Sequence, residues 1–158
     1  MGTAVGLNHV SVPARDLDAS EAFYVEVLGL ERIAAPNFDV PVRWLRCGDL
    51  QVHLYRREGE AEPSLAQHFG ITVTDFMAVY RRVREFRAEA PFAWVTELPD
   101  GSVQMYVRDP HGNLVELDHP DATTVDRAAM TDYRVLAEHV EQSPEARASK
   151  LFLDQAST

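Results

Sequence analysis

The chain has 158 residues, 46% of them hydrophobic and 25% charged, with a formal net charge of −10 at pH 7. This length and composition predict one compact globular domain and argue against a disordered chain, and the acidic charge argues against nucleic acid or an anionic membrane as main partner. No apolar run is long enough to cross a bilayer, and the first ten residues lack signal-peptide features. The single cysteine, Cys47, cannot form an intramolecular disulfide, so we expect a cytoplasmic protein.

The first half of the chain predicts a strand, a helix and then three strands. Alternating side chains indicate a strand over residues 7–13. Asp16 or Asp18 can cap a helix after it, and Gly29 lies where a helix C-terminal glycine is expected. Three further strands are expected over residues 30–35, 42–47 and 50–56, and the Gly-Asp turn at 48–49 predicts that the last two form a hairpin.

The second half repeats the same order. A strand over residues 67–74 precedes a helix that Thr74 or Asp75 can cap. The apolar face of this helix recurs every three or four positions and consists of Phe76, Val79, Tyr80, Val83 and Phe86. Strands are then expected over residues 92–98, 102–108 and 114–119, and the last two are joined by the turn sequence DPHGN.

The two halves also match in register. A histidine begins the first strand of each half, and an aspartate follows it seven positions later; both pairs are 59 positions apart (68 − 9 and 75 − 16). We therefore predict an α+β fold in one structural domain, with a first βαβββ module over 1–57, a linker over 58–66 and a second βαβββ module over 67–119. Residues 120–158 lie outside the repeat and are expected to form a helical C-terminal extension that packs on the rest.

Four side chains with metal-ligand chemistry occupy corresponding strand positions in the two modules: His9, His53, His68 and Glu116. Their neighbours are largely apolar, so the period of two places all four on the face turned away from the helices. Imidazole and carboxylate suit zinc, iron, nickel, cobalt or manganese, and two histidines with one carboxylate also suit Fe(II) oxygen chemistry. A lone strand histidine is more often a hydrogen-bonded structural residue, and we assign that role to His111, His119 and His139.

With these motifs, residues 7–118 resemble the vicinal oxygen chelate superfamily, which includes glyoxalase I, extradiol ring-cleavage dioxygenases, fosfomycin-modifying enzymes and bleomycin-resistance proteins. GLNHVSVPARDLDASEAFYVEVLGL is similar to the family's opening strand and helix, and YVRDPHGNLVEL to its closing hairpin. The resemblance implies a half-open, mixed-sheet barrel around one divalent metal ion. It also implies the ligands His9, His68 and Glu116, with His53 at a fourth, variable position. A homodimer is the implied assembly, with the modules paired within one chain or across two.

Three functions remain open at this point. The first is a metal-dependent glyoxalase-like lyase or isomerase that chelates a small substrate through vicinal oxygens. The second is an Fe(II) extradiol-type dioxygenase, and the third is a non-catalytic drug or natural-product binding (resistance) protein. The catalytic candidates are Glu116, as a proton-transfer group, and Tyr106. The candidates for substrate contact, by strand alternation, are Trp44, Arg46, Gln51, Tyr55 and Thr72. The resemblance to fosfomycin-modifying enzymes, which carry a hydroxyl residue two positions after the first ligand, adds Ser11.

Overall fold

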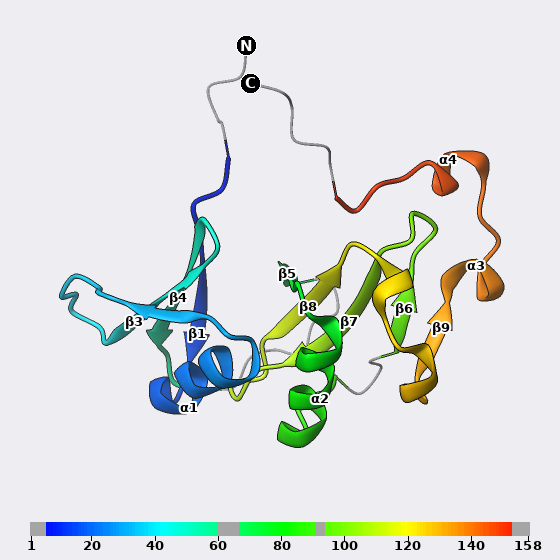
Figure 1. Cartoon of the computed structure of the whole chain (residues 1–158). Coiled ribbons are helices and arrows are strands. Elements are labelled where there is room, and N and C mark those ends of the chain that lie inside the picture. The colour runs from blue at the N-terminus through cyan, green and yellow to red at the C-terminus, as the bar shows by residue number, and fades with distance from the viewer. Residues whose placement is uncertain (1–5, 60–66, 91–93, 153–158) are drawn as a thin grey trace, which may run out of the picture. The chain divides into compact units, whose positions relative to one another are not determined.

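A computed structural model describes residues 6–59, 67–90 and 94–152 (Figure 1). The chain divides into two compact units. One comprises Met1–Phe69 and Arg108–Val115, and the other comprises Gly70–Val107 and Glu116–Thr158. Most of the predicted linker, the start of the predicted strand at 92–98 and the last part of the tail lie outside the described residues.

The first sheet has four strands in the order β1-β4-β3-β2. They are β1 (His9–Ala14), β2 (Glu31–Ile33), β3 (Val42–Cys47) and β4 (Leu50–Arg56). Strand β1 runs parallel to β4, and the other pairs are antiparallel. Cys47 faces Leu50 across the expected hairpin, and Gly48 in its two-residue turn has φ +58°, a conformation that glycine adopts without strain.

The second sheet has the order β5-β8-β7-β6-β9, so its first four strands repeat the order of the first sheet. They are β5 (His68–Thr72), β6 (Val95–Glu97), β7 (Val103–Arg108) and β8 (Leu114–His119). The fifth strand, β9 (Tyr133–Val135), pairs in parallel with β6. The α+β class and the duplicated βαβββ order are therefore confirmed.

Each module carries its helix between its first and second strands (Figure 1). In α1 (Leu17–Ala22), the Asp16 carboxylate caps the helix by accepting hydrogen bonds from the first backbone N–H groups. The helix continues as a π-helical segment, η1 (Phe23–Val27), and ends at Gly29 with φ +79°. In α2 (Phe76–Phe86), Asp75 is the cap. Both caps were among the predicted residues, whereas the π-helical turn was not predicted.

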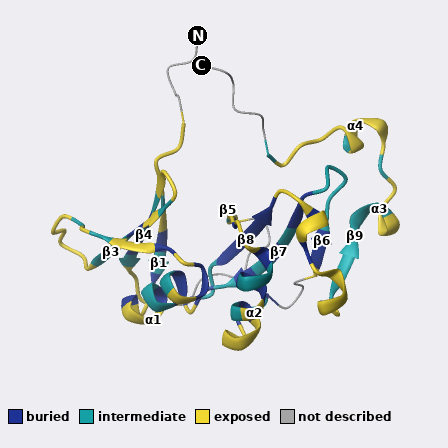
Figure 2. Cartoon of the chain, in the orientation of Figure 1, coloured by how far each residue is buried: buried dark blue, intermediate teal, exposed yellow. Residues whose placement is uncertain are grey.

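The core of each unit forms on the helix-facing side of its sheet (Figure 2). In the first unit, alternate residues of β1 and β4 are buried. Strand β8, whose first two residues belong to the first unit and the rest to the second, is buried along its whole length. The helices contribute one apolar stripe each, including Tyr24 and Val83, which are fully buried. Phe86, the last residue of the stripe predicted for α2, is half exposed because the helix ends there.

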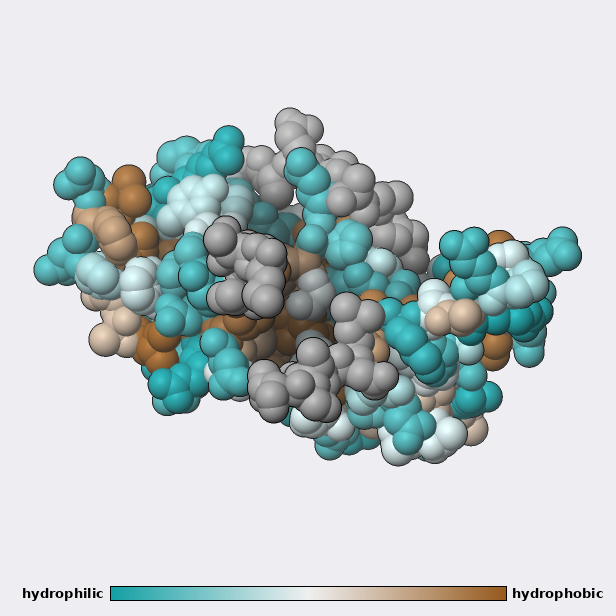
Figure 3. Space-filling model, turned by 90° about the horizontal axis from the view of Figure 1, so that it is seen from above, coloured by the Kyte–Doolittle hydropathy of each residue, from teal (hydrophilic) through white to brown (hydrophobic). Residues whose placement is uncertain are grey.

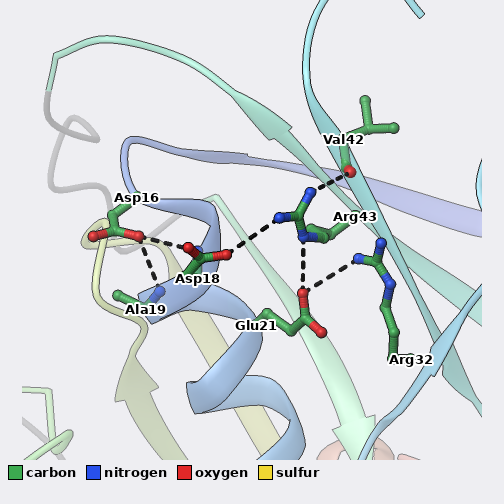
Figure 4. A network of polar contacts seen from close by, with 7 residues as sticks. All are labelled: Asp16, Asp18, Ala19, Glu21, Arg32, Val42 and Arg43. Atoms are coloured by element: carbon green, nitrogen blue, oxygen red, sulfur yellow. Dashed lines mark hydrogen bonds and ion pairs between the residues drawn. The ribbon is translucent and has the colours of Figure 1, made fainter. Parts of the chain in front are cut away.

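Charged side chains link α1 to its sheet (Figure 4). The Arg43 guanidinium on β3 lies 3.2 Å from the Asp18 carboxylate and 3.0 Å from Glu21. Arg32 on β2 also reaches Glu21, at 3.3 Å. These groups are partly exposed, so each pair contributes only about 0–1 kcal/mol to stability. They fix the direction of the helix across the strands rather than hold the fold together.

The turn between β7 and β8 packs into the first unit, although it comes late in the sequence. The Asn113 amide donates to the Pro13 carbonyl oxygen at 2.9 Å, and the Arg15 backbone N–H donates to Nδ1 of His111 at 3.1 Å. The buried Tyr24 hydroxyl donates to the Asp109 carboxylate at 3.0 Å. Burial raises the pKa of both Tyr24 and Asp109.

We expect Tyr24→Phe to lower the free energy of unfolding by about 1–3 kcal/mol, because a buried carboxyl loses one of its donors. The measurement is urea unfolding followed by circular dichroism. The matched control is Tyr55→Phe on β4, since that side chain is only half-buried. Equal stability of wild type and Tyr24→Phe would show that this hydrogen bond contributes little to the fold.

The C-terminal extension is less helical than the sequence indicated. Its helices are short: η2 (Ala122–Thr124), η3 (Arg127–Ala129), α3 (Leu136–His139) and α4 (Pro144–Arg147). The predicted start at Ser143 is confirmed, since this side chain caps α4. The expectation of a helical tail omitted β9, which consists of β-prone residues and pairs with the otherwise open edge of β6. Among the described residues, we find no helix with the length and apolar character needed to cross a membrane.

Candidate functional site

Seven of the predicted site residues lie on one face of the first sheet. Strand pairing places Ser11 and Trp44 on either side of His53, and His9 and Arg46 on either side of Gln51. These positions alternate along each strand with buried residues that face the helix. The seven residues on this face, which we call the first-sheet face, are His9, Ser11, Trp44, Arg46, Gln51, His53 and Tyr55.

Aromatic rings form a row across the first-sheet face. The His53 ring stacks on Trp44 with centroids 4.1 Å apart and planes 4° apart, and on His9 at 4.4 Å and 19°. Phe38 extends the row beyond Trp44, at 6.2 Å. A metal ion lies close to the plane of an imidazole that binds it, and two nearly parallel planes do not meet near the rings. In this arrangement, His9 and His53 do not point at one common ion.

Hydrogen bonds indicate which ring nitrogen of each histidine remains available. Nδ1 of His9 lies 2.5 Å from the Asn8 side-chain oxygen, so Nδ1 donates this hydrogen bond and Nε2 is the ring nitrogen left for another partner. Nε2 of His53 lies 2.8 Å from the Gln51 side-chain oxygen and therefore acts as a donor. Partial burial, and then the nearby charge of His9, lower the pKa of His53. His9 thus has the tautomer of a metal ligand, while both the ring faces and Nε2 of His53 are in use.

In the second unit, Glu116 and Tyr106 form a pair on neighbouring strands. Glu116 on β8 is 9% exposed, and the Tyr106 hydroxyl on β7 donates a hydrogen bond to it. Burial, the Glu116 charge and this hydrogen bond together raise the pKa of Tyr106 well above its usual value. Tyr106 therefore stays protonated at neutral pH and orients the Glu116 carboxylate.

Strand β5 carries the remaining two predicted residues. His68, Gly70 and Thr72 alternate with Phe69 and Ile71 along it, and these three are exposed while Ile71 is buried. His68 and Thr72 are thus on the side of β5 turned away from the core. Strand β5 is the neighbour of β8 in the sheet.

Asp118 was not among the predicted residues. It follows Glu116 by two positions on β8, so the two carboxylates share a face. Asp118 is 6% exposed, and among the described residues its Oδ1 has no hydrogen-bond partner. Burial, and then the Glu116 charge, raise the pKa of Asp118 to about 7. The same period of two that indicated Glu116 could have indicated Asp118.

The histidines assigned to structural roles have the surroundings expected of such residues. His111 is buried and accepts the Arg15 N–H. His119 is buried beside Phe76, with its ring nitrogens 2.8 Å from the Val73 carbonyl oxygen and from the Thr124 hydroxyl. His139 is exposed in α3.

The side chains fit a divalent metal ion in kind. They supply imidazole nitrogens on exposed strand positions, a buried carboxylate held by a tyrosine, and a second buried carboxylate oxygen without a partner. Within residues 6–59, 67–90 and 94–152, no three histidine, cysteine, aspartate or glutamate side chains are gathered closely enough to hold an ion. The set of ligands is therefore argued from chemistry and strand position.

A comparison with protein families identifies the fold. Residues 6–117 match the model of the Glyoxalase/Bleomycin resistance protein/Dioxygenase superfamily. The chain belongs to this superfamily. The match covers both βαβββ modules and ends just after Glu116, and members of the superfamily generally bind a divalent metal ion.

Individual proteins and solved structures also match most of the chain. The uncharacterized protein YwbC of Bacillus subtilis (strain 168) is 29% identical over 119 residues, which is 70% of this chain and 94% of YwbC. A lactoylglutathione lyase from Agrobacterium tumefaciens is 26% identical, with a TM-score of 0.56 over 75% of this chain and 96% of that protein. The fosfomycin resistance protein FosX from Listeria monocytogenes shares the fold, with a TM-score of 0.63 at 17% identity over 73% of this chain and 91% of FosX.

Proposed function

We propose that this protein is a metal-dependent, glyoxalase-like enzyme that binds a small substrate through two adjacent oxygens and catalyses a lyase or isomerase reaction. His9, His68 and Glu116 are the proposed ligands of one divalent ion: zinc, nickel, Fe(II), manganese or cobalt. We further propose that the enzyme is a cytoplasmic homodimer. The superfamily and the likeness to a lactoylglutathione lyase support the reaction class.

The observation that carries the proposal is the buried Glu116 carboxylate with the Tyr106 hydroxyl bonded to it. Glu116 has a phenol donor and a second carboxylate on the same face of β8. Two carboxylates buried next to each other repel when both are ionised, so their pairing needs a compensating cation or a shared proton. These surroundings suit a carboxylate that binds a cation or moves a proton.

The roles of the chain's own groups follow from this arrangement. The chemistry that a bound divalent cation supplies is stabilisation of the negative charge that develops on two adjacent substrate oxygens. Glu116 accepts a proton from one oxygen-bearing substrate carbon and, in an isomerisation, returns the same proton to the adjacent oxygen-bearing carbon. The Tyr106 hydroxyl holds the Glu116 carboxylate in one orientation while the proton moves. Trp44 and the stacked His53 offer ring edges to a partly apolar substrate.

The Fe(II) dioxygenase is the second candidate, because two histidines and a glutamate are its ligand set. Ring cleavage also needs a histidine beyond the ligands as acid and base. His111 and His119 are buried and hydrogen-bonded in the core. His53 is stacked between Trp44 and His9, and its Nε2 is bonded to Gln51, so these three histidines are already engaged, which favours the lyase or isomerase. A metal-free binding protein is the third candidate. The presence of His9, His68 and Glu116 at the positions of the proposed ligands, and the acidic pair Glu116 and Asp118, argue against it.

The test is the metal content of untagged protein, measured by mass spectrometry before and after treatment with a chelator. We expect about one transition-metal ion per chain. Oxygen uptake with catechols and isomerisation of 2-oxoaldehyde thiol adducts then separate the two enzyme candidates. Absence of bound metal, together with no rise in Tm on adding Zn, Ni, Mn or Fe(II), would reject the metal-dependent enzyme in favour of the binding protein.

A further inference from the structure

The Asp118 carboxylate is buried, although the protein carries many acidic groups. Hydrophilic residues cover much of the face in Figure 3, as expected for a chain with 25 acidic and 15 basic residues. Asp118, in contrast, is 94% buried, given its 6% exposure. Leaving a carboxylate oxygen buried and unpartnered costs several kcal/mol, so such a group is either protonated or bound by something else.

Strand β5 leaves space for the Asp118 carboxylate. A Cβ atom placed on Gly70 would lie 2.7 Å from Oδ2 of Asp118, closer than real Cβ atoms approach other atoms. Gly70 has no positive φ, so its backbone conformation does not require glycine. A side chain at position 70 would occupy the space that the Asp118 carboxylate fills, and only glycine leaves this space open. Asp118 therefore leans over the face of β5 between the exposed positions His68 and Thr72.

The charge of the neighbouring groups favours a cation as the partner of Asp118. Among the described residues, the ionisable groups that act on this side chain include the Glu116 carboxylate and the Tyr106 phenol. A neutral donor would satisfy Oδ1 but would leave two buried carboxylates repelling each other. A divalent cation bound to both would offset the repulsion and fill the open position of Oδ1.

We propose that Asp118 binds the same divalent cation as Glu116, through the Oδ1 oxygen that has no partner among the described residues. This inference rests on the proposed function, because it adds a second carboxylate to the proposed ligands His9, His68 and Glu116. Asp118 takes the place that sequence reasoning gave to His53, whose ring is stacked between Trp44 and His9. The mixture of two imidazoles and two carboxylates favours Mn(II), Fe(II), Co(II) or Zn(II).

The experiment compares the affinity of metal-free wild type, Asp118→Asn and Gly70→Ala for Co(II) and Zn(II), by competition with a chromophoric chelator. Asn keeps the shape of Asp118 and removes its charge, whereas the Ala methyl group displaces the carboxylate and keeps its charge. We expect both variants to bind about 10- to 100-fold more weakly. The visible spectrum of the Co(II) protein should also change in both, because the spectrum reports the ligands directly.

Matched controls make the same chemical changes at other positions. Asp121→Asn removes one charge from an exposed residue three positions along, and asparagine also caps helices. Gly6→Ala adds a methyl group where nothing lies within 4 Å. Both controls should bind as wild type does. Urea unfolding of all variants in chelator checks that each is folded before its affinity is compared.

The outcomes separate this inference from the proposed function. Wild-type affinity and an unchanged Co(II) spectrum in Asp118→Asn and Gly70→Ala, with binding lost in His68→Ala, would overturn the role of Asp118 and keep the metal enzyme. Failure of wild type itself to bind any metal would overturn both. Weaker binding in Asp118→Asn alone, with Gly70→Ala unaffected, would show a general charge effect and also count against ligation.

Discussion

His68→Ala is expected to lose divalent-metal binding by more than about 100-fold, beyond the 10- to 100-fold typical of residues that only orient a ligand. His68 begins β5 on the exposed side of the strand, in the same frame in which His9 begins β1. An imidazole nitrogen binds these metal ions more strongly than the water molecule that would take its place in the variant. Isothermal titration with Zn(II) or Co(II) measures the loss, and any catalytic activity should fall with it.

The metal affinity of His53→Ala should be compared with that of His68→Ala. Because the His53 ring is stacked on both sides and its Nε2 bonds to Gln51, we expect its removal to weaken metal binding by about 10-fold or less. His139→Ala, in the exposed α3, serves as the control for losing a histidine. Equal losses at His68 and His53 would make His53 a primary ligand. Full metal occupancy in His68→Ala would rule out the proposed ligand set.

Asp118→Asn is expected to stabilise the metal-free protein, and more strongly as the pH rises from about 4 to about 7. Burial, and then the Glu116 charge, raise the pKa of this carboxyl to about 7 in the folded state, from an ordinary value of 3.8. Below pH 4 the Asp118 carboxyl is protonated in both the folded and the unfolded protein, so its ionisation does not change the free energy of unfolding. Between these values only the unfolded state ionises, so wild-type stability falls with pH, and above about 7 the loss is complete.

The size of this effect is bounded by the titration of one group, at most about 1.4 kcal/mol per pH unit. Urea unfolding of wild type and Asp118→Asn at pH 5 and pH 7.5 in chelator measures it. Each kcal/mol corresponds to about 2–4 °C in Tm for a chain of this size. Asp121→Asn should follow wild type at both pH values. A difference between wild type and Asp118→Asn that does not change with pH would mean that Asp118 is ionised throughout.

Local patterns in the sequence predicted most of the fold. Alternation located β1, β4 and β8, the capping aspartates located the starts of α1 and α2, and Gly29 located the end of the first helix. The duplicated frame predicted that both sheets would have the same strand order. These features could be predicted because each depends on side chains a few positions apart, or on one repeat distance.

Features that depend on contacts distant in sequence were missed. The three residues of β9 become a strand only because β6 offers an open edge. The π-helical segment η1 has no residue signature of its own. Alternation placed His53 on the same face as Ser11 and Trp44, but it did not reveal the stacking with Trp44 and His9, which depends on side-chain conformation. Asp118 was passed over because a carboxylate near a strand end is usually solvated.

The turn between β7 and β8 belongs to the first unit but comes late in the sequence, and this affects the order in which the protein folds. Its hydrogen bonds join residues 85 apart for Tyr24 and Asp109, 96 apart for Arg15 and His111, and 100 apart for Pro13 and Asn113. During synthesis, the N-terminal module emerges from the ribosome long before the segment that satisfies these groups. The two halves of the duplicated chain therefore complete their folding together, and a protein cut in the linker would yield an unfinished first fragment.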